Sequence, residues 1–250
     1  MYDTHIIQHV IPLKADAKPF QQNFQKMHLS LEPLVKQEVN KLLAAHIVFQ
    51  VRHCKWVANL VLVRKNNGDL RLCIEFCNLN KASEKDNYLV LTMEQILHKL
   101  VGFEIFSLLD GFSGYNKILV TNNDQLSTTF CTPWGTYAYR KIPFRLINKH
   151  DTFQRAMDIA FRGLINDCVV VYLDDVTIYS KRRTDHIKHL RQIFKRCRKY
   201  GISLNPKKSI YGVIEGKLLG FIVSKEGIKI DPERIEEISK LPPCTSKKSM

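Results

Sequence analysis

Two adjacent aspartates interrupt the most apolar part of this sequence, and this feature limits the folds that are open to the chain. Asp174 and Asp175 stand between Val169–Leu173 and Val176–Tyr179, two runs rich in β-branched and aromatic residues. Such runs with a polar break predict an antiparallel hairpin that carries both acids at its tip. Like charges beside a buried strand pair repel each other, so we expect a bound cation to stabilise them. The alternative is an exposed turn, where aspartate is common.

A third acid lies in similar surroundings. Asp110 ends the apolar strand predicted over Ile105–Leu109. Three carboxylates at strand ends can hold two Mg²⁺ ions, which activate an attacking 3′-hydroxyl and stabilise a leaving pyrophosphate. Because side chains alternate along a strand, Asp174 and Asp175 would point to opposite faces. We therefore expect the turn to relax this alternation, or Asp174 to do most of the metal bridging.

The remaining hydrophobic pattern predicts strands and separate helices without a regular alternation of the two, which is typical of an α+β fold. An extended segment is expected before residue 29. The predicted helices cover residues 31–45, 91–100, 151–164 and 184–200, and two further hairpins are predicted over residues 57–76 and 128–142.

The charge balance favours a polyanionic partner. The chain has 38 Lys and Arg against 24 Asp and Glu, a net charge of +14, which favours nucleic acid before a membrane surface; solubility alone is the competing explanation. The basic segment Lys181–Lys208 is either a solvated helix face or a contact to template or primer phosphates. No secretory signal and no apolar run of about 18 residues are visible, so we expect an intracellular protein, cytoplasmic or nuclear, with no membrane partner.

Several segments resemble the motifs of reverse transcriptases, in the order in which those motifs occur. Phe106–Asp110 with Ser113–Tyr115 resembles motif A, and Tyr172–Asp175 resembles motif C. The intervening block and motifs D and E are resembled by Thr129–Gly135, Ile142–Phe144, Thr152–Gln154, Leu204–Lys208 and Leu219–Phe221. The whole order is similar to the polymerase of gypsy-type LTR retrotransposons.

This resemblance implies a right-hand polymerase fold with palm and fingers and with a thumb that is absent or only begun. Residues 1–85 and 118–146 would form the fingers, 86–117 and 147–229 the palm, and 230–250 the start of the thumb or connection. The implied activity is that of an RNA-directed DNA polymerase, a nucleotidyltransferase that adds dNTPs to a primer 3′ end with two Mg²⁺ ions, for which Mn²⁺ could substitute. The implied partners are an RNA or DNA template with its primer, dNTPs and other domains of a polyprotein.

The resemblance also implies roles for individual residues. Asp110, Asp174 and Asp175 match the metal-binding catalytic aspartates, and Lys208 matches a lysine that protonates the leaving pyrophosphate, with Lys207 as the alternative. The residues expected to bind the incoming nucleotide are Lys65, Arg71, Tyr115, Phe144 and Gln154. The residues expected to form the primer grip are Leu219, Gly220 and Phe221.

Three segments depart from the family pattern. Arg145 stands where the family has a glycine, a residue that allows close approach of the backbone to a ligand. Lys149–Asp151 replaces small residues, and Ile74–Cys77 replaces a block that carries an arginine. These departures support a second hypothesis, a catalytically impaired remnant that still binds nucleic acid. A different two-metal phosphotransferase is a third.

Overall fold

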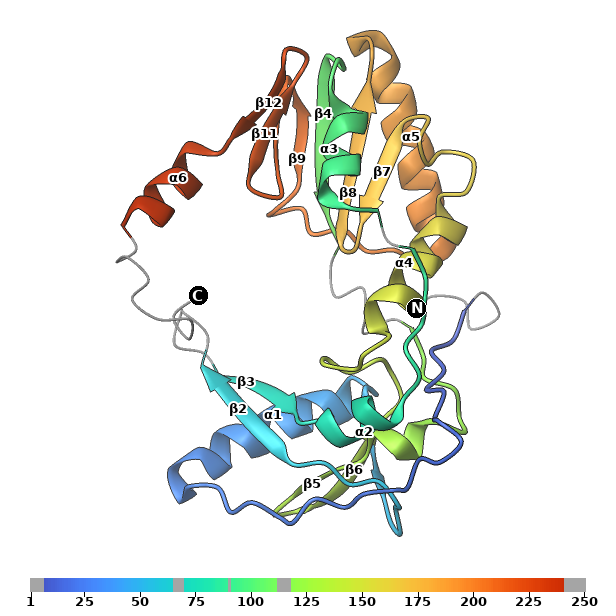
Figure 1. Ribbon diagram of the computed structural model, residues 1–250, viewed down its shortest axis with the longest axis vertical. Coiled ribbons are helices and arrows are strands. Elements are labelled where there is room, and N and C mark those ends of the chain that lie inside the picture. The colour runs from blue at the N-terminus through green and yellow to red at the C-terminus, as the bar shows by residue number, and fades with distance from the viewer. Residues whose placement is uncertain (1–6, 65–69, 90, 112–117, 241–250) are drawn as a thin grey trace. The chain divides into compact units, whose positions relative to one another are not determined.

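The chain forms two compact units in the computed structural model, which describes residues 7–64, 70–89, 91–111 and 118–240 (Figure 1). The first unit comprises Met1–Val90, Phe112–Ala160 and Cys197–Ser203, and the second comprises Leu91–Gly111, Phe161–Arg196 and Leu204–Met250. Each unit contains strands and separate helices, as the α+β prediction requires. Residues 147–160, expected in the palm, fall in the first unit, and the boundaries of fingers and palm stay predictions.

The first unit contains two small antiparallel sheets. One sheet has the order β1-β6-β5, and the other is the β2-β3 hairpin. Their strands are β1 (Val48–Val51), β2 (Leu60–Arg64), β3 (Leu70–Ile74), β5 (Phe130–Thr132) and β6 (Gly135–Tyr139), and the helices of the unit are η1 (Leu29–Leu31), α1 (Glu32–Ala44), α2 (Cys77–Ala82), η3 (Gln125–Thr128) and α4 (Lys149–Ala160). The sequence pattern predicted both hairpins and the helices α1 and α4. It missed β1 and α2, because four and six residues are too short to display a period.

An extended segment precedes η1, as expected. It is held by isolated bridges that pair His9 with Val120, Leu13 with Ser83 and Gln21 with Val57. The side chain of Gln22 also holds the segment, since its Oε1 accepts a hydrogen bond of 2.7 Å from the backbone amide of Asn59. Among the described residues, no helix combines the length and the apolar character needed to cross a membrane.

The second unit is built on a four-stranded antiparallel sheet with the order β7-β8-β4-β9. These strands are β4 (Ile105–Asp110), β7 (Val169–Tyr172), β8 (Asp175–Ser180) and β9 (Ile210–Val213). A second sheet contains β10 (Glu215–Leu218), β11 (Phe221–Ser224) and β12 (Gly227–Ile230), and the helices are α3 (Met93–Leu100), α5 (Arg183–Tyr200, which belongs to this unit up to Arg196) and α6 (Pro232–Ser239). A capping box between Thr92 and Gln95 defines the start of α3.

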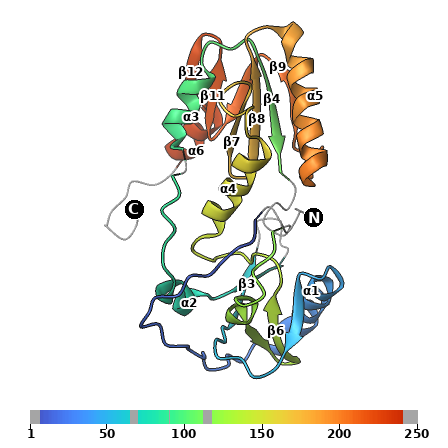
Figure 2. The same cartoon turned by 90° about the vertical axis from the view of Figure 1, so that its right-hand side faces the viewer.

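The four-stranded sheet is covered differently on its two faces. On one face, Phe106, Val170 and Tyr179 pack with α3 and with residues of the second sheet. The opposite face carries Ser107 and Ser180, whose hydroxyl groups lie 2.7 and 2.8 Å from the two ring nitrogens of His186 in α5. Figure 2 shows α3 and α5 on opposite sides of the sheet. The alternation of side chains along β4 therefore separates an α3 face from an α5 face.

Candidate active site

The tip of the β7-β8 hairpin places the two adjacent acids. Tyr172 pairs with Asp175, so Leu173 and Asp174 form a two-residue turn. Leu173 adopts a left-handed backbone conformation with φ 54°, which costs a residue with a Cβ about 1–2 kcal/mol. The hairpin prediction is confirmed, and Asp175 is the first residue of the returning strand.

The strand register brings Asp110 and Asp175 face to face. They are direct cross-strand partners, the last residue of β4 and the first of β8, so their side chains lie on the same face, the α3 face. Burial, and next the charge of Asp110, raise the pKa of the Asp175 carboxyl, whereas Lys208 acts in the opposite direction. A buried carboxylate that faces a second acid in this way favours a bound cation.

The backbone of Asp174 meets the residue that follows Asp110. The amide of Gly111 donates a hydrogen bond of 2.8 Å to the Asp174 carbonyl. A Cβ on Gly111 would lie 3.0 Å from that same oxygen, so only glycine fits here without a shift of the turn. The backbone of Asp174 is therefore fixed at the same end of the sheet as the facing pair, with Oδ1 of Asp174 buried. The expectation that Asp174 does most of the metal bridging stays a prediction.

A turn from the segment that resembles motif D encloses Asp110. The Asn205 amide donates a hydrogen bond of 2.8 Å to the Asp110 carbonyl, and its side-chain Nδ2 donates one of 3.2 Å to Asp110 Oδ2. The Asp110 amide in turn donates to Ser209 Oγ at 3.3 Å. Sequence reasoning assigned no role to Asn205 or Ser209, although both lie beside Lys208. Only the pairing of distant segments reveals their contacts.

Lys208 shares a cavity with the acids. Its Nζ lies 4.0 Å from Asp110 Oδ2, and its side chain is 72% exposed, so the ammonium group can reach a ligand as well as the carboxylate. The cavity has a volume of about 220 Å³. It is lined by Leu108, Leu109, Asp110, Asp175, Thr177, Lys208, Ile210, Lys217, Leu218 and Leu219.

The segment expected as the primer grip is a tight turn between β10 and β11. Leu218 pairs with Phe221, and the two turn residues, Leu219 and Gly220, have φ angles of 52° and 80°. Positive φ at both positions is the geometry of a type I′ hairpin turn. Nη1 of Arg234 in α6 donates a hydrogen bond of 3.1 Å to the Leu219 carbonyl. A side chain on Gly220 would overlap the Arg234 guanidinium, so this glycine lets α6 brace the turn.

Lys217 is a second cation of the cavity that sequence reasoning missed. Its Nζ lies 2.7 Å from Asp231 and 2.6 Å from Glu233. Hydrogen bonds to these two acids raise the pKa of Lys217. Asp231 also caps α6 by accepting a hydrogen bond from the Glu233 amide. The ion pairs therefore connect β10 to the first turn of α6.

The residues expected to bind the nucleotide lie in the first unit, as far as they are described. Phe144 is 42% exposed, and Lys149 Nζ lies 4.5 Å from the centre of its ring. Gln154 is buried in α4 and donates a hydrogen bond of 3.1 Å to Asp158 Oδ1. The expected sites Lys65 and Tyr115 lie outside the described residues, as does the side chain of Arg71, whose backbone pairs with Val63. Their roles stay predictions.

Arg145 has a left-handed backbone conformation, which glycine adopts at the least cost. Its φ angle is 75° and its side chain is exposed. The side chain of Asn80 holds the loop on both sides of Arg145: Nδ2 donates 2.7 Å to the Arg145 carbonyl, and Oδ1 accepts 3.0 Å from the Ile147 amide. The loop thus carries an exposed charged side chain on a turn that the Asn80 side chain holds.

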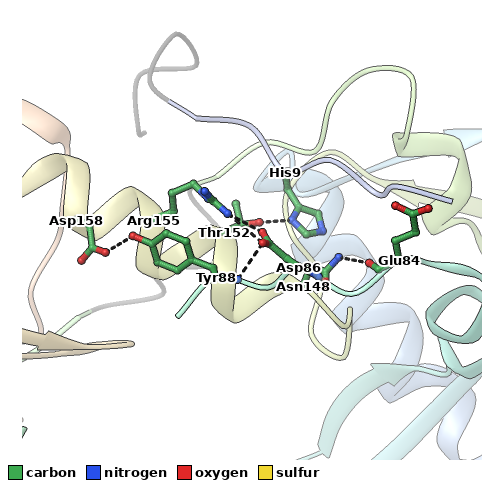
Figure 3. A network of polar contacts seen from close by, with 8 residues as sticks. All are labelled: His9, Glu84, Asp86, Tyr88, Asn148, Thr152, Arg155 and Asp158. Atoms are coloured by element: carbon green, nitrogen blue, oxygen red, sulfur yellow. Dashed lines mark hydrogen bonds and ion pairs between the residues drawn. The ribbon is translucent and has the colours of Figure 1, made fainter. Parts of the chain in front are cut away.

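Polar contacts join α4 to the segment around residue 86 and to the N-terminal strand (Figure 3). Arg155 donates two hydrogen bonds of 2.9 and 3.1 Å to the Asp86 carboxylate, and Tyr88 donates to Asp158. His9 Nδ1 lies 2.8 Å from Thr152 Oγ1. Burial lowers the pKa of His9 to about 4, so this histidine is neutral near pH 7.

The acid site suits a hard divalent cation. Mg²⁺ takes one or two protein carboxylates and completes its shell with water and phosphate oxygens, and the facing pair Asp110 and Asp175 offers this donor set. Within the described part of the chain, no three His, Cys, Asp or Glu side chains already converge as a metal-binding group. The pair therefore fits a cation whose remaining ligands come from a bound substrate.

An antiparallel sheet whose central strands end in facing carboxylates, with a braced hairpin turn beside them, defines the palm of a nucleic-acid polymerase. The chain belongs to the reverse transcriptase (RNA-dependent DNA polymerase) family, whose model matches residues 63–223.

Curated relatives support this assignment. The chain is 32% identical over 219 residues to the retrovirus-related Pol polyprotein from transposon gypsy of Drosophila melanogaster, covering 86% of this chain and 21% of the relative. It is 33% identical over 188 residues to the Pol polyprotein from transposon opus of the same organism, with coverages of 74% and 19%. The enzymatic polyprotein of Cauliflower mosaic virus (strain Strasbourg) is 32% identical over 178 residues, with coverages of 71% and 26%. The chain thus spans about a fifth to a quarter of these relatives.

Solved structures support the fold. A foamy viral protease-reverse transcriptase in complex with double-stranded DNA has a TM-score of 0.87 at 20% identity, covering 99% of this chain and 43% of that one. The foamy viral protein in complex with an RNA/DNA hybrid has a TM-score of 0.86 at 20% identity, with coverages of 99% and 33%. The palm-and-fingers fold class expected from the sequence is confirmed.

Proposed function

We propose that this chain is an RNA-directed DNA polymerase that adds dNTPs to a primer 3′ end on an RNA or DNA template. The observation that carries the proposal is the facing pair Asp110 and Asp175, which shares one cavity with Lys208 and the turn residue Leu219. The family membership supports the same activity. As the resemblance implies, the enzyme would act as part of a retrotransposon polyprotein.

The proposed site residues have separate roles. Asp110 and Asp175, together with Asp174, would hold two Mg²⁺ ions, for which Mn²⁺ is a substitute; such ions lower the pKa of an attacking hydroxyl and neutralise the leaving phosphates. Lys208 would give the proton on its Nζ to an oxygen of the departing pyrophosphate. Leu219, Gly220 and Phe221 would hold the primer end, while Phe144, Gln154, Arg71, Lys65 and Tyr115 would contact the incoming nucleotide.

Primer extension on an RNA template with dNTPs and Mg²⁺ tests this proposal. We expect extension by the unaltered chain and a loss of at least about 100-fold in Asp110→Asn and Asp175→Asn, because each removes a carboxylate of the metal site. Asp167→Asn is the matched control, since this aspartate is exposed in the same unit and away from the cavity. Equal activity in all three variants would refute the assignment of the acids.

The second candidate function is a catalytically impaired remnant that binds nucleic acid without copying it. Arg145 favours this alternative, because its exposed side chain occupies a loop position at which the family has glycine. Under this alternative, the unaltered chain binds a primer-template but does not extend it. Extension would then appear in the combined variant Arg145→Gly, Lys149→Ala and His150→Gly. Rapid extension by the unaltered chain would exclude the remnant.

A further inference from the structure

The outer side of α5 carries a row of cations. Lys188, Arg191 and Lys195 are exposed and follow each other at intervals of three and four residues, so they lie on one side of the helix. Lys181 and Arg182, also exposed, precede the helix. We call these five residues the α5 basic row.

This row contributes nothing evident to folding. Within the part of the chain that the structure describes, none of its five members forms an ion pair. Like charges three or four residues apart cost a helix about 0.2–0.5 kcal/mol per pair. Cations beside a helix start also interact unfavourably with the helix dipole. The protein therefore carries these charges against a small cost in stability.

Catalysis does not account for the row either. His186 and Ile193, on the inner side of α5, are 2% and 0% exposed, and His186 contacts Ser107 and Ser180. Ser107 is three residues from Asp110 along β4, so the two side chains point to opposite faces of the sheet. The α5 basic row thus lies on the outer side of the layer opposite the catalytic acids, where a primer end held at Asp110 and Asp175 is out of reach.

We propose that the α5 basic row binds single-stranded RNA, independently of sequence, at a surface separate from the catalytic face. Lys188 and Lys195 are seven residues apart, or about 10 Å along the helix, a length over which a nucleic-acid strand carries more than one phosphate. A phosphate chain suits this row, because the row is long, cationic and flanked by a single exposed apolar residue of α5, Ile187.

A membrane surface fits the row less well than RNA does. A helix that lies in a membrane interface inserts its apolar side into the lipid. The inner side of α5 is already buried, as His186 and Ile193 show with 2% and 0% exposure, and His186 contacts two residues of the sheet. The inference goes beyond the proposed polymerase activity, since it concerns RNA outside the catalytic face.

The test compares two triple variants of the whole chain. The first, Lys188→Gln, Arg191→Gln and Lys195→Gln, removes the centre of the row. The second, Lys18→Gln, Lys36→Gln and Lys55→Gln, removes the same charge from exposed lysines of the first unit. Binding of oligouridine RNA is measured by fluorescence anisotropy over a range of NaCl concentrations. We expect the first variant to reduce the slope of log K against log salt by about 2, as three lost phosphate contacts to a single strand require.

Further measurements distinguish RNA binding by the α5 basic row from a general effect of net charge and from membrane binding. Extension of a short primer-template whose single-stranded overhang is a few nucleotides long should be equal in the first variant and the unaltered chain, and circular dichroism should show the same helix content. An equal loss of RNA affinity in both variants would overturn the proposal in favour of a net-charge effect. Unchanged RNA binding with lost binding to phosphatidylserine vesicles would overturn it in favour of a membrane. RNA binding is read without catalysis, so an inactive polymerase does not affect the result.

Discussion

Asp110 is the residue whose position depends most on its neighbours. Its carbonyl and Oδ2 both accept hydrogen bonds from Asn205, and its amide donates to Ser209. The same turn carries Lys208 to within 4.0 Å of Asp110. Asn205 is therefore a positioning residue, which fixes the orientation of the carboxylate and the place of the lysine together.

Replacing Asn205 should impair catalysis more than stability. We expect Asn205→Ala to slow primer extension by about 10-fold, because a hydrogen bond to a charged group contributes about 1.5–3 kcal/mol. Ser209→Ala is the control, since it removes backbone contacts alone, a hydrogen bond of 3.3 Å from the Asp110 amide and one of 2.7 Å to the Asn205 carbonyl, and leaves the side-chain contact of Asn205 with the Asp110 carboxylate in place. Single-turnover extension gives the rates, and Mg²⁺-induced thermal stabilisation provides a second readout. A larger defect in Ser209→Ala would contradict this assignment.

Arg145 allows backbone strain and side-chain obstruction to be separated. Arg145→Gly should raise the free energy of unfolding by about 0.5 kcal/mol, because relief of the left-handed strain exceeds the added freedom of the unfolded chain. Arg145→Ala removes the same side chain but keeps the strain, so its stability should not rise. Urea denaturation measures both. If the free energy of unfolding rises equally in the two variants, backbone strain at residue 145 is not the cause.

At the scale of elements, the period of the hydrophobic residues predicted the helices and hairpins that are long and amphipathic. The helix α5 and the β7-β8 hairpin were expected because buried residues recur at regular intervals in both. The spacing of three residues between Ser107 and Asp110 is also visible in the sequence, and in a strand it places the two side chains on opposite faces. The pairing of β4 with β9 is not visible there, because non-local register depends on neighbours that the local pattern does not report.

The contact between the N-terminal extended segment and α4 should weaken in acid. The pKa of His9 is about 4 in the folded chain against 6.5 ordinarily, so between these values the unfolded chain takes up a proton that the folded chain does not. The contribution is complete above pH 6.5 and decreases as the pH falls to 4, by up to about 3 kcal/mol. Urea unfolding at several pH values measures this change.

The variant His9→Gln isolates the histidine from the carboxylates that titrate in the same range. Glutamine retains a hydrogen-bonding group toward Thr152 but has no proton to gain. We expect the stability difference between the unaltered chain and this variant to narrow from pH 6.5 to 4. Parallel curves would show that His9 is not the group that titrates.

At the scale of the whole molecule, the net charge of +14 should make salt act in two opposite directions. Screening relieves repulsion within the folded chain, so the melting temperature should rise by about 2–4 °C between low salt and about 0.3 M NaCl. RNA affinity should fall over the same range. Differential scanning fluorimetry and anisotropy on the same samples measure both. A melting temperature that decreases with salt would mean that specific ion pairs dominate.

The candidate site was predictable in part. The three acids and Lys208 could be found because each stands in a short run with a clear pattern or a family resemblance. Asn205, Lys217 and Arg234 could not, since their roles arise from contacts with other elements that the local pattern does not report. Sequence reasoning thus found the groups that would do chemistry and missed those that hold them.

The two faces of β4 have a consequence for how copies of a retrotransposon gene of this family could lose function. Ser107 and Leu109 face α5, whereas Leu108 and Asp110 face the catalytic side. Deletion of a single codon within this strand would leave every aspartate in the gene, yet it would turn the Asp110 carboxylate toward α5. A copy of the gene can therefore retain all the catalytic aspartates expected in its family and still encode an inactive protein. We expect such inactive copies to carry in-frame deletions in the codons of β4 that precede Asp110.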